Sequence, residues 1–171
     1  FKVYAVGGCV RDALLGLQPH DYDLCTNAST EEMAQLFSDH TLVRSGEKHG
    51  TIGVVIDDTV YEITTFRTEG GYKDSRHPSW VEFVEEVNED LARRDFTVNA
   101  MAYAPDAGYI DPWGGMKDLE NHILRAVGDP ATRFTEDSLR ILRGVRFAVR
   151  FGLTVDLATE KAMFAQAPLM D

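Results

Sequence analysis

The chain of 171 residues is poor in cysteine, in positive charge and in long hydrophobic runs. Its two cysteines, Cys9 and Cys25, lack a C-x-x-C spacing, so the sequence predicts neither a disulfide framework nor a zinc site. The net charge of −11 excludes a chain-wide basic surface for nucleic acid, so such a partner must be held by local arginines or by a missing part. No apolar run could span a bilayer and no signal-peptide pattern is present, so we expect no membrane partner and a cytoplasmic setting.

The order of the sequence patterns predicts an α+β part followed by an all-α part. Apolar residues 1–6 end in Gly7-Gly8 and lead into an amphipathic segment at 10–15, which indicates a strand, a tight turn and a helix. β-Rich runs at 51–56 and 60–66, separated by Asp57-Asp58-Thr59, indicate a hairpin. Other expected elements are a helix at 30–37, capped by Ser29 or Thr30 and with Met33, Leu36 and Phe37 on one face; a loop at 70–78; and a turn at 111–115.

The all-α part begins near Gly128-Asp129-Pro130, which divides the chain into 1–128 and 129–171. A long helix is expected from Thr135, ended by Gly152, and a shorter one from Leu157. Its apolar positions at helical spacing are Leu139, Leu142, Val145 and Val149. The chain ends without a clear stop signal, so we expect a piece of a longer protein with its second part truncated.

The glycine pair is a candidate anion cradle. Gly8 has no Cβ, so backbone N–H groups there can approach an anion, and the helix start adds partial positive charge beside Arg11. Alone, such a pair is most often only a turn. It matches neither the G-x-G-x-x-G fingerprint nor the P-loop pattern.

Asp21 and Asp23 are candidate metal ligands, because they share a face if residues 21–24 are extended. A solvated loop is the plain alternative. A calcium loop is disfavoured because Thr26 stands where that loop needs glycine, and a His-Asp phosphohydrolase because the histidines after His20 show no clustered spacing. Paired carboxylates after an anion cradle are what metal-assisted chemistry on a phosphate needs.

Glu62 is the best candidate for a third carboxylate, because two divalent ions need more anionic oxygens than two aspartates supply. It lies inside the strand-like run 60–66, where a charge is out of place unless it is paired or bound to metal. The alternative is a glutamate on an edge strand that faces water.

The charge-dense run at 89–100 has two interpretations. It could be a solvated helix with i,i+4 pairs such as Glu89 with Arg93. However, Arg94 and Asp95 precede an apolar segment that would bury Asn99 unless it has hydrogen-bond partners. Arginine, aspartate and asparagine near a phosphate cradle suit a triphosphate and its ribose hydroxyls.

A second charged run, at 136–147, places four side chains on one drifting stripe opposite Leu139, Leu142 and Val145: Asp137, Arg140, Arg143 and Arg146. Asp137 with Arg140 could be a surface pair only. Three arginines beside a phosphate site favour nucleotide binding, and arginine with aspartate offers a base edge both donors and acceptors.

Five ordered motifs over residues 3–151 resemble the bacterial tRNA nucleotidyltransferase/poly(A) polymerase family, class II: G-G-x-V-R-D, D-x-D, R-R-D-F-T-x-N-A, D-P-x-G-G and E-D-x-x-R-x-x-R. The resemblance implies a polymerase-β-like nucleotidyltransferase head at 1–128, with a small mixed sheet and helices, and a helical neck at 129–171; the family's body and tail are absent. It also implies that Asp21 and Asp23 ligate Mg²⁺, with Glu62 as the third carboxylate.

The resemblance implies roles for the remaining candidates. Gly8 and Arg11 would hold the triphosphate, with Arg94 beside it and Asp95 near the ribose. Asp137 and Arg140 would read the incoming base, and Arg143 and Arg146 would support the nucleotide and its phosphates.

Family resemblance leaves several reactions open: addition of CCA, of A only or of CC only to tRNA, and poly(A) synthesis. The loop at 70–78 resembles the flexible loop of enzymes that reach the A step, and residues 82–93 lack the glycine-basic-phenylalanine run of the family's poly(A) polymerases. We therefore expect template-independent transfer of CMP and AMP from CTP and ATP to the 3′ end of tRNA by a two-metal mechanism. The alternatives are an A-adding enzyme, a poly(A) polymerase, or a non-catalytic nucleotide sensor. Loss of Asp21, Asp23 or Glu62 would indicate a sensor, and all three are present.

Overall fold

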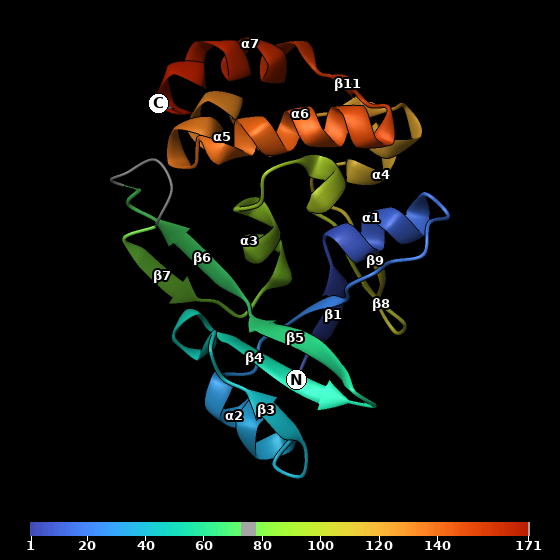
Figure 1. Cartoon of the computed structure of the whole chain (residues 1–171), viewed down its shortest axis with the longest axis vertical. Coiled ribbons are helices and arrows are strands. Elements are labelled where there is room, and N and C mark those ends of the chain that lie inside the picture. Colours follow the sequence, from blue (N-terminus) through green and yellow to red (C-terminus); the bar gives the residue numbers. More distant parts are fainter. Residues whose placement is uncertain (73–77, 171) are drawn as a thin grey trace.

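The computed structural model describes residues 1–72 and 78–170, which form one mixed sheet with helices beside it and a layer of helices at one end (Figure 1). The strand order in this sheet of the described residues is β3-β4-β5-β2-β1-β8-β9; β2 and β5 pair in parallel, and the other neighbouring strands of the sheet pair antiparallel. This architecture confirms the predicted α+β class. The strands are β1 (Val3–Val6), β2 (Asp23–Thr26), β3 (Thr41–Val43), β4 (Thr51–Ile56), β5 (Thr59–Thr65), β8 (Ala102–Ala104) and β9 (Gly108–Ile110).

The helices divide between the sheet and the end layer. Beside the sheet lie α1 (Gly8–Leu14), α2 (Thr30–Leu36), α3 (Val87–Ala92) and α4 (Gly115–Glu120), with the 3₁₀ turns η1 (Glu47–His49) and η2 (Thr97–Asn99). The helical layer consists of α5 (Pro130–Glu136), α6 (Leu139–Phe151) and α7 (Leu157–Gln166), followed by η3 (Ala167–Met170). None of the helices in the described ranges combines the length and apolar character that a membrane span requires.

Two small ribbons complete the fold. β6 (Arg67–Gly70) pairs antiparallel with β7 (Trp80–Phe83). Gly70, the first residue of the loop predicted at 70–78, is therefore the last residue of β6. Part of that loop, residues 73–77, lies outside the described residues. β10 (Ile123–Leu124) pairs in parallel with β11 (Thr154–Val155), which lies between α6 and α7 in the chain.

Several elements form where short sequence signals predict them. Ser29 caps α2 through a complete capping box with Glu32, and the β4–β5 hairpin turns at Asp57 and Asp58, which both have positive φ. β5 begins at Thr59, one residue before the predicted start. The expected common face of α2 is wrong at Leu36, which is 64% exposed while Met33 is buried.

The long helix expected from Thr135 is interrupted. α5 begins earlier, at Pro130, and ends before Asp137, whose backbone is extended; the Asp137 carboxylate then accepts a hydrogen bond from the Leu139 N–H at the start of α6. Gly152 ends α6 in the left-handed conformation, as predicted.

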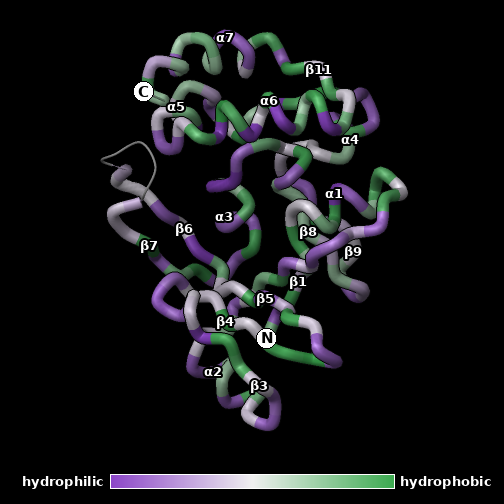
Figure 2. Tube along the Cα trace, in the orientation of Figure 1, coloured by the Kyte–Doolittle hydropathy of each residue, from purple (hydrophilic) through white to green (hydrophobic). Residues whose placement is uncertain are grey.

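The apolar stripe of α6 is not its buried face. Leu142, Val145 and Val149 are exposed, whereas Arg140, Ile141 and Gly144 are buried. Hydrophilic and hydrophobic residues alternate along this helix in Figure 2. The physical reason is that Arg140 and Arg143 find partners on this side of α6. Arg143 pairs with the buried Asp95 of the sheet part, and Arg140 pairs with the half-buried Glu136 on α5 and donates to the carbonyl oxygen of Arg93.

A hydrophobic core crosses the predicted boundary at residue 128. Phe96 and Leu124 from the first part share one cluster with Phe134, Ile141 and Met163 of the helical layer. Phe96 packs against Phe134 with ring centroids 6.3 Å apart. The division into 1–128 and 129–171 stays a prediction, and the shared core holds the helical layer firmly against the sheet part.

Candidate functional site

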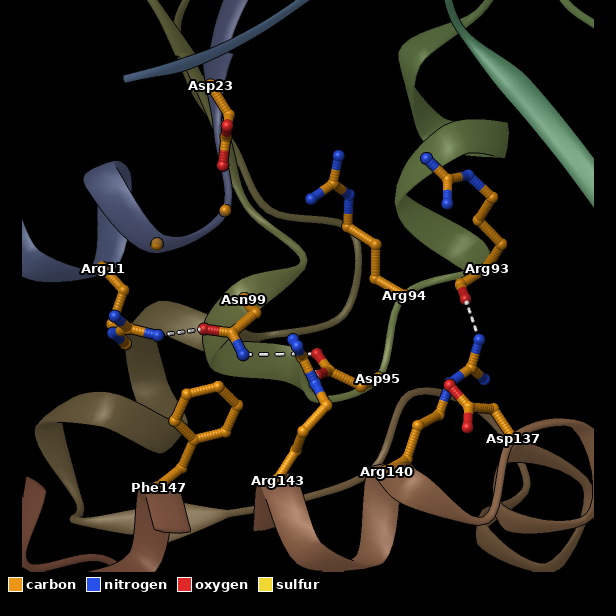
Figure 3. A pocket seen from close by; sticks show the side chains of 12 residues that line it. Arg11, Asp23, Arg93, Arg94, Asp95, Asn99, Asp137, Arg140, Arg143 and Phe147 are labelled. Atoms are coloured by element: carbon orange, nitrogen blue, oxygen red, sulfur yellow. Dashed lines mark hydrogen bonds and ion pairs between the residues drawn. The ribbon is translucent and has the colours of Figure 1, made fainter. Parts of the chain in front are cut away.

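A cavity of about 420 Å³ lies where the sheet part meets the helical layer (Figure 3). Its wall is strongly polar, because arginines and carboxylates come from both sides. The lining residues are Gly7, Gly8, Arg11, Asp23, Arg93, Arg94, Asp95, Asn99, Asp137, Arg140, Arg143 and Phe147. A volume of this size is in the range of small-molecule sites.

The glycine pair forms one wall, at the junction of β1 and α1. Gly7 has a φ of +75°, which favours glycine, and a Cβ there would lie 3.0 Å from Nη1 of Arg94. Its N–H donates to the carbonyl oxygen of Met101 at 3.0 Å, which fixes the turn. Glycine at this position therefore allows the Arg94 guanidinium to lie against the backbone of the turn.

The acidic wall is built by β2 and β5. Asp23 begins β2 and lines the cavity, and its register partner on the parallel strand β5 is Glu62. Register partners on parallel strands point to the same face, so the two exposed carboxylates lie on one side of the sheet. Asp21 lies in the bend before β2, so the extended run expected from residue 21 starts only at Asp23.

Arg93 and Arg94 form an arginine wall of the cavity, and Asp90, which is 1% exposed, is buried beneath them. Its Oδ1 accepts from Nη2 of Arg93 at 2.9 Å and its Oδ2 from Nη2 of Arg94 at 3.0 Å. Burial raises the pKa of Asp90, but the charges of the two guanidinium groups together outweigh it and hold this pKa below its ordinary value. Sequence reasoning paired Arg93 with Glu89 and missed Asp90, although the i,i+3 and i,i+4 spacings were available.

A chain of hydrogen bonds crosses the cavity floor from α1 to α6 (Figure 3). Nη1 of Arg11 donates to Oδ1 of Asn99 at 2.5 Å, and Nδ2 of Asn99 donates to Oδ1 of Asp95 at 3.2 Å. Oδ2 of Asp95 accepts from Nε of Arg143 at 2.8 Å. Asn99 is buried with partners on both sides of its amide, as the sequence required.

The helical layer contributes an aspartate and an arginine to the opposite wall. Nη1 of Arg140 pairs with Glu136 at 2.9 Å, Nη2 donates to the carbonyl oxygen of Arg93 at 3.2 Å, and Nε lies 4.0 Å from the Asp137 carboxylate. Glu136 thus positions Arg140, a role that sequence reasoning missed even though Glu136 opens the E-D-x-x-R motif.

Nine of the twelve candidate residues line the cavity: Gly8, Arg11, Asp23, Arg94, Asp95, Asn99, Asp137, Arg140 and Arg143. Asp21, Glu62 and Arg146 are not among the lining residues, and Arg146 is exposed on α6. Gly7, Arg93 and Phe147 line it without having been chosen. Phe147 follows Arg143 by one helical turn, which was the available signal.

Asp21, Asp23 and Glu62 are the carboxylates that could hold a metal ion here. Among residues 1–72 and 78–170 there is no group of three or more histidine, cysteine, aspartate or glutamate side chains arranged as a protein-only metal cage. Mg²⁺ is commonly bound by one or two carboxylates together with substrate phosphates and water. The exposed carboxylates beside a polar cavity fit such a shared site.

The fold is that of a polymerase-β-like nucleotidyltransferase head. A solved structure of the Bacillus stearothermophilus CCA-adding enzyme in complex with CTP matches 99% of this chain, with a TM-score of 0.88 and 41% sequence identity. The match covers 40% of that enzyme's chain. A Thermotoga maritima CCA-adding enzyme complexed with tRNA_CCA matches 97% of this chain with a TM-score of 0.78 and 30% identity, and 38% of its own length is covered.

The sequence profile of the poly(A) polymerase head domain matches residues 3–125, so the chain belongs to this family. Curated relatives are CCA-adding enzymes of Streptococcus suis, 50% identical, and Limosilactobacillus fermentum, 47% identical, each over all 171 residues. The chain spans 42% of the length of these relatives.

Proposed function

We propose that this chain is the catalytic part of a template-independent nucleotidyltransferase that adds CMP and AMP to the 3′ end of tRNA. The observation that carries the proposal is the cavity itself: a strand-end carboxylate, a cluster of arginines and the Asp137–Arg140 pair surround one space of nucleotide size. Relatives named CCA-adding enzymes, one of them in complex with CTP, support the choice of nucleotide chemistry.

The triphosphate would lie between the glycine turn and the arginine wall. Arg94 is held against Gly7 by Asp90, so its charge is fixed before the nucleotide arrives. Gly8 leaves backbone N–H groups accessible at the same wall. Arg11, which lines the cavity beside the glycine turn, would hold the triphosphate with them.

Asp21 and Asp23 would hold Mg²⁺, with Glu62 beside Asp23 as the third carboxylate. Bound Mg²⁺ would lower the pKa of the attacking 3′-hydroxyl and stabilise the departing pyrophosphate. The chain's own residues position the reactants: Asp95 and Asn99 lie on the cavity floor, where the ribose hydroxyls would be fixed.

The base would face Asp137 and Arg140, with Arg143 supporting the nucleotide from the same helix and Arg146 more distant on it. A carboxylate accepts from the exocyclic amine of cytosine or adenine, and a guanidinium donates to the ring nitrogen or carbonyl. Uracil and guanine present a carbonyl where that amine would be. The pair therefore supports selection of CTP and ATP.

The tRNA would require protein outside this chain, because the net charge is −11 and the arginines near the cavity are largely engaged with carboxylates. A head at 1–128 and a neck at 129–171 fit that picture. A poly(A) polymerase and a non-catalytic sensor are the competing functions.

The test is incubation of the full-length protein with tRNA that lacks its 3′ CCA, with CTP, with ATP and with both, followed by sequencing of the products. We expect two C residues with CTP alone and a terminal CCA with both nucleotides. A homopolymer of A would indicate a poly(A) polymerase. Nucleotide binding without any extension of the RNA would indicate a sensor.

A further inference from the structure

A second cavity, of about 760 Å³, lies beside Glu62 and apart from the residues placed around the nucleotide. Its walls come from η1, β5 and the β6–β7 ribbon, which lies at the side of β4 and β5 in Figure 1. Glu62 lines this second cavity, and its register partner Asp23 lines the first. Register partners on adjacent strands are about 5 Å apart, so each cavity is bordered by one carboxylate of the pair. The other charged and aromatic side chains of the second cavity are Lys48, His49, Arg67, Glu69 and Trp80.

The two cavities follow one another across the sheet. β2 lies between β1, which ends at the glycine turn, and β5, which carries Glu62. The cavities also share a wall, because Nε of Arg93 donates to the carbonyl oxygen of Arg67 at 3.0 Å. In nucleotidyl transfer the attacking and leaving oxygens lie roughly in line on opposite sides of the phosphorus. With the triphosphate at the glycine turn, the pyrophosphate leaves on the β1 side, so the attacking 3′-hydroxyl must approach from the β5 side, where the second cavity lies.

Trp80 provides an aromatic surface in this cavity. A Cβ on Gly70, its partner across the ribbon, would lie 2.6 Å from Cζ2 of the indole, and a Cβ on Gly71 would lie 3.3 Å from its Nε1. The ring therefore rests against the backbone of two glycines, yet Trp80 is 50% exposed. An indole that is supported by backbone and remains half exposed suits stacking with an unpaired base, because every base has a π-face.

Basic groups lie in the same cavity. Lys48 is exposed on η1, and the acidic residue before it, Glu47, pairs with Arg44 at 3.4 Å. A guanidinium nitrogen of Arg67 donates to the carbonyl oxygen of His49, which ties η1 to β6. The turn that carries the lysine is therefore fixed relative to the ribbon that carries the indole. A positive charge beside a stacking surface is the combination that binds the phosphates and bases of a single strand.

We propose that the second cavity binds the single-stranded 3′ end of the RNA that is extended. One of the terminal bases stacks on Trp80, a phosphate lies beside Lys48, and the 3′-hydroxyl reaches the catalytic carboxylates past Glu62. The rest of the RNA is held by protein outside this chain, so this subsite sets the position of the attacking hydroxyl rather than the bulk of the affinity. The inference rests on the proposed nucleotidyl transfer.

The test uses the full-length protein and three variants, Trp80→Leu, Trp80→Phe and Lys48→Gln. Leucine keeps an apolar side chain without a ring, phenylalanine keeps a ring, and glutamine removes the charge. Tyr109→Leu and Lys117→Gln are the matched controls, because both residues are exposed and line neither cavity. The readouts are kcat/KM for tRNA that lacks its 3′ CCA, the dissociation constant of CTP without RNA, and the dissociation constant of a single-stranded RNA ending in CC without nucleotide.

We expect Trp80→Leu to lower kcat/KM for the tRNA and to raise the dissociation constant of the single-stranded RNA, each about tenfold, which is the scale of one lost base–aromatic stack. Trp80→Phe should stay within about threefold of the wild type, because a ring is retained. Lys48→Gln should make RNA binding less sensitive to salt, with a slope of log affinity against log salt that is smaller by about one. The dissociation constant of CTP should stay within about twofold in every variant, and both controls should match the wild type.

CTP binding weakened as strongly as RNA binding would overturn the inference, because the second cavity would then belong to the incoming nucleotide. An equal loss in Trp80→Leu and Trp80→Phe, or a lower melting temperature with unchanged RNA binding, would also overturn it, since Trp80 would then only support the ribbon. If the wild type extends no RNA, the proposed function fails, and binding of the single-stranded RNA decides alone. Weaker binding by Trp80→Leu but not by Tyr109→Leu then supports the subsite, and equal binding by these two variants overturns it.

Discussion

A buried carboxylate organises the arginine wall, and its protonation state links the site to stability. Asp90 holds both Arg93 and Arg94, and Arg93 also lies 3.5 Å from Glu69 on β6. Burial lowers the pKa of Arg93, but Asp90 and Glu69 together outweigh it and hold this pKa above its ordinary value. Asp90 and Arg93 are therefore both charged at neutral pH, and each needs the other in order to remain buried.

Asp90→Asn should lower the free energy of unfolding by about 3–5 kcal/mol at pH 7, because it leaves two guanidinium groups without their buried counter-charge. The pKa of Asp90 is lower in the folded than in the unfolded chain, so its contribution is complete above about pH 5 and is lost as the pH falls through the folded value. Urea unfolding from pH 7 to pH 3 measures this. Glu89→Gln, an exposed neighbour, is the control, and an equal acid dependence in wild type and Asp90→Asn would contradict the assignment.

Asp137 should decide base choice. Asp137→Ala should relax selection against UTP and GTP by about ten- to a hundred-fold, corresponding to about 1–3 kcal/mol for a mismatched buried group. Asp137 also caps α6 at Leu139, so Asp137→Asn serves as a second variant that can retain the cap. Incorporation of the four nucleotides is compared with that by Asp106→Ala, on the exposed β8–β9 turn. An unchanged order of preference in both Asp137 variants would remove this helix from base recognition.

At the scale of elements, α6 approaches the sheet part at a glycine. A Cβ on Gly144 would lie 2.8 Å from Cζ of Phe96 and 3.3 Å from Cε of Met163. Such contacts force neighbouring groups to move, and Phe96 is completely buried in the shared core. The absence of a side chain at residue 144 therefore sets how closely the arginine face of α6 lies over the cavity.

Gly144→Ala should destabilise the protein by about 1–3 kcal/mol through overpacking, even though alanine is the better helix former. It should also lower kcat, since α6 carries Arg140 and Arg143. Thermal unfolding and the addition assay measure the two effects. Val149→Ala, at an 80% exposed position of the same helix, should change neither. A Gly144→Ala protein as stable and active as the wild type would show that the close approach of α6 is unimportant.

Elements with local causes were predictable from the sequence. The capping box at Ser29, the hairpin turn at Asp57-Asp58 and the glycine end of α6 each depend on residues a few positions apart. The buried face of α6 was not predictable, because the sheet part supplies Asp95, which pairs with Arg143, and Phe96 packs against Gly144. Hydrophobic periodicity alone could not reveal partners that are distant in sequence.

The same distinction, between local signals and partners distant in sequence, applies to the candidate site. The motifs drew attention to Asp23, Asn99 and Arg140, which the fold brings to one cavity. Two groups that orient the arginines of the site were missed: the buried Asp90, which holds Arg94, and the half-buried Glu136, which holds Arg140. Arg11 lines the same cavity, and its partners Asp12 and Asn99 became visible only in the structure.

At the scale of the whole molecule, the cavity exists only where the sheet part and the helical layer meet. Asp23 and Gly8 come from one side and Arg140 and Arg143 from the other, and the core around Phe96 joins the two. The acidic chain concentrates arginines at this junction despite its net charge of −11. Local charge, rather than overall charge, therefore suits the site to a nucleotide triphosphate.

The central claim is that the carboxylates at the start of β2 carry metal-dependent nucleotidyl transfer at this cavity. The most direct measurement is the addition of CMP to tRNA lacking its 3′ CCA by the full-length protein with saturating Mg²⁺, comparing Asp21→Asn and Asp23→Asn with Asp39→Asn, an exposed aspartate paired with His40. We predict that Asp21→Asn and Asp23→Asn lose transfer while remaining folded, because each removes a ligand charge without disturbing a buried pair, and that Asp39→Asn retains full activity. Retention of more than a few per cent of wild-type activity by either of the first two variants would contradict the account.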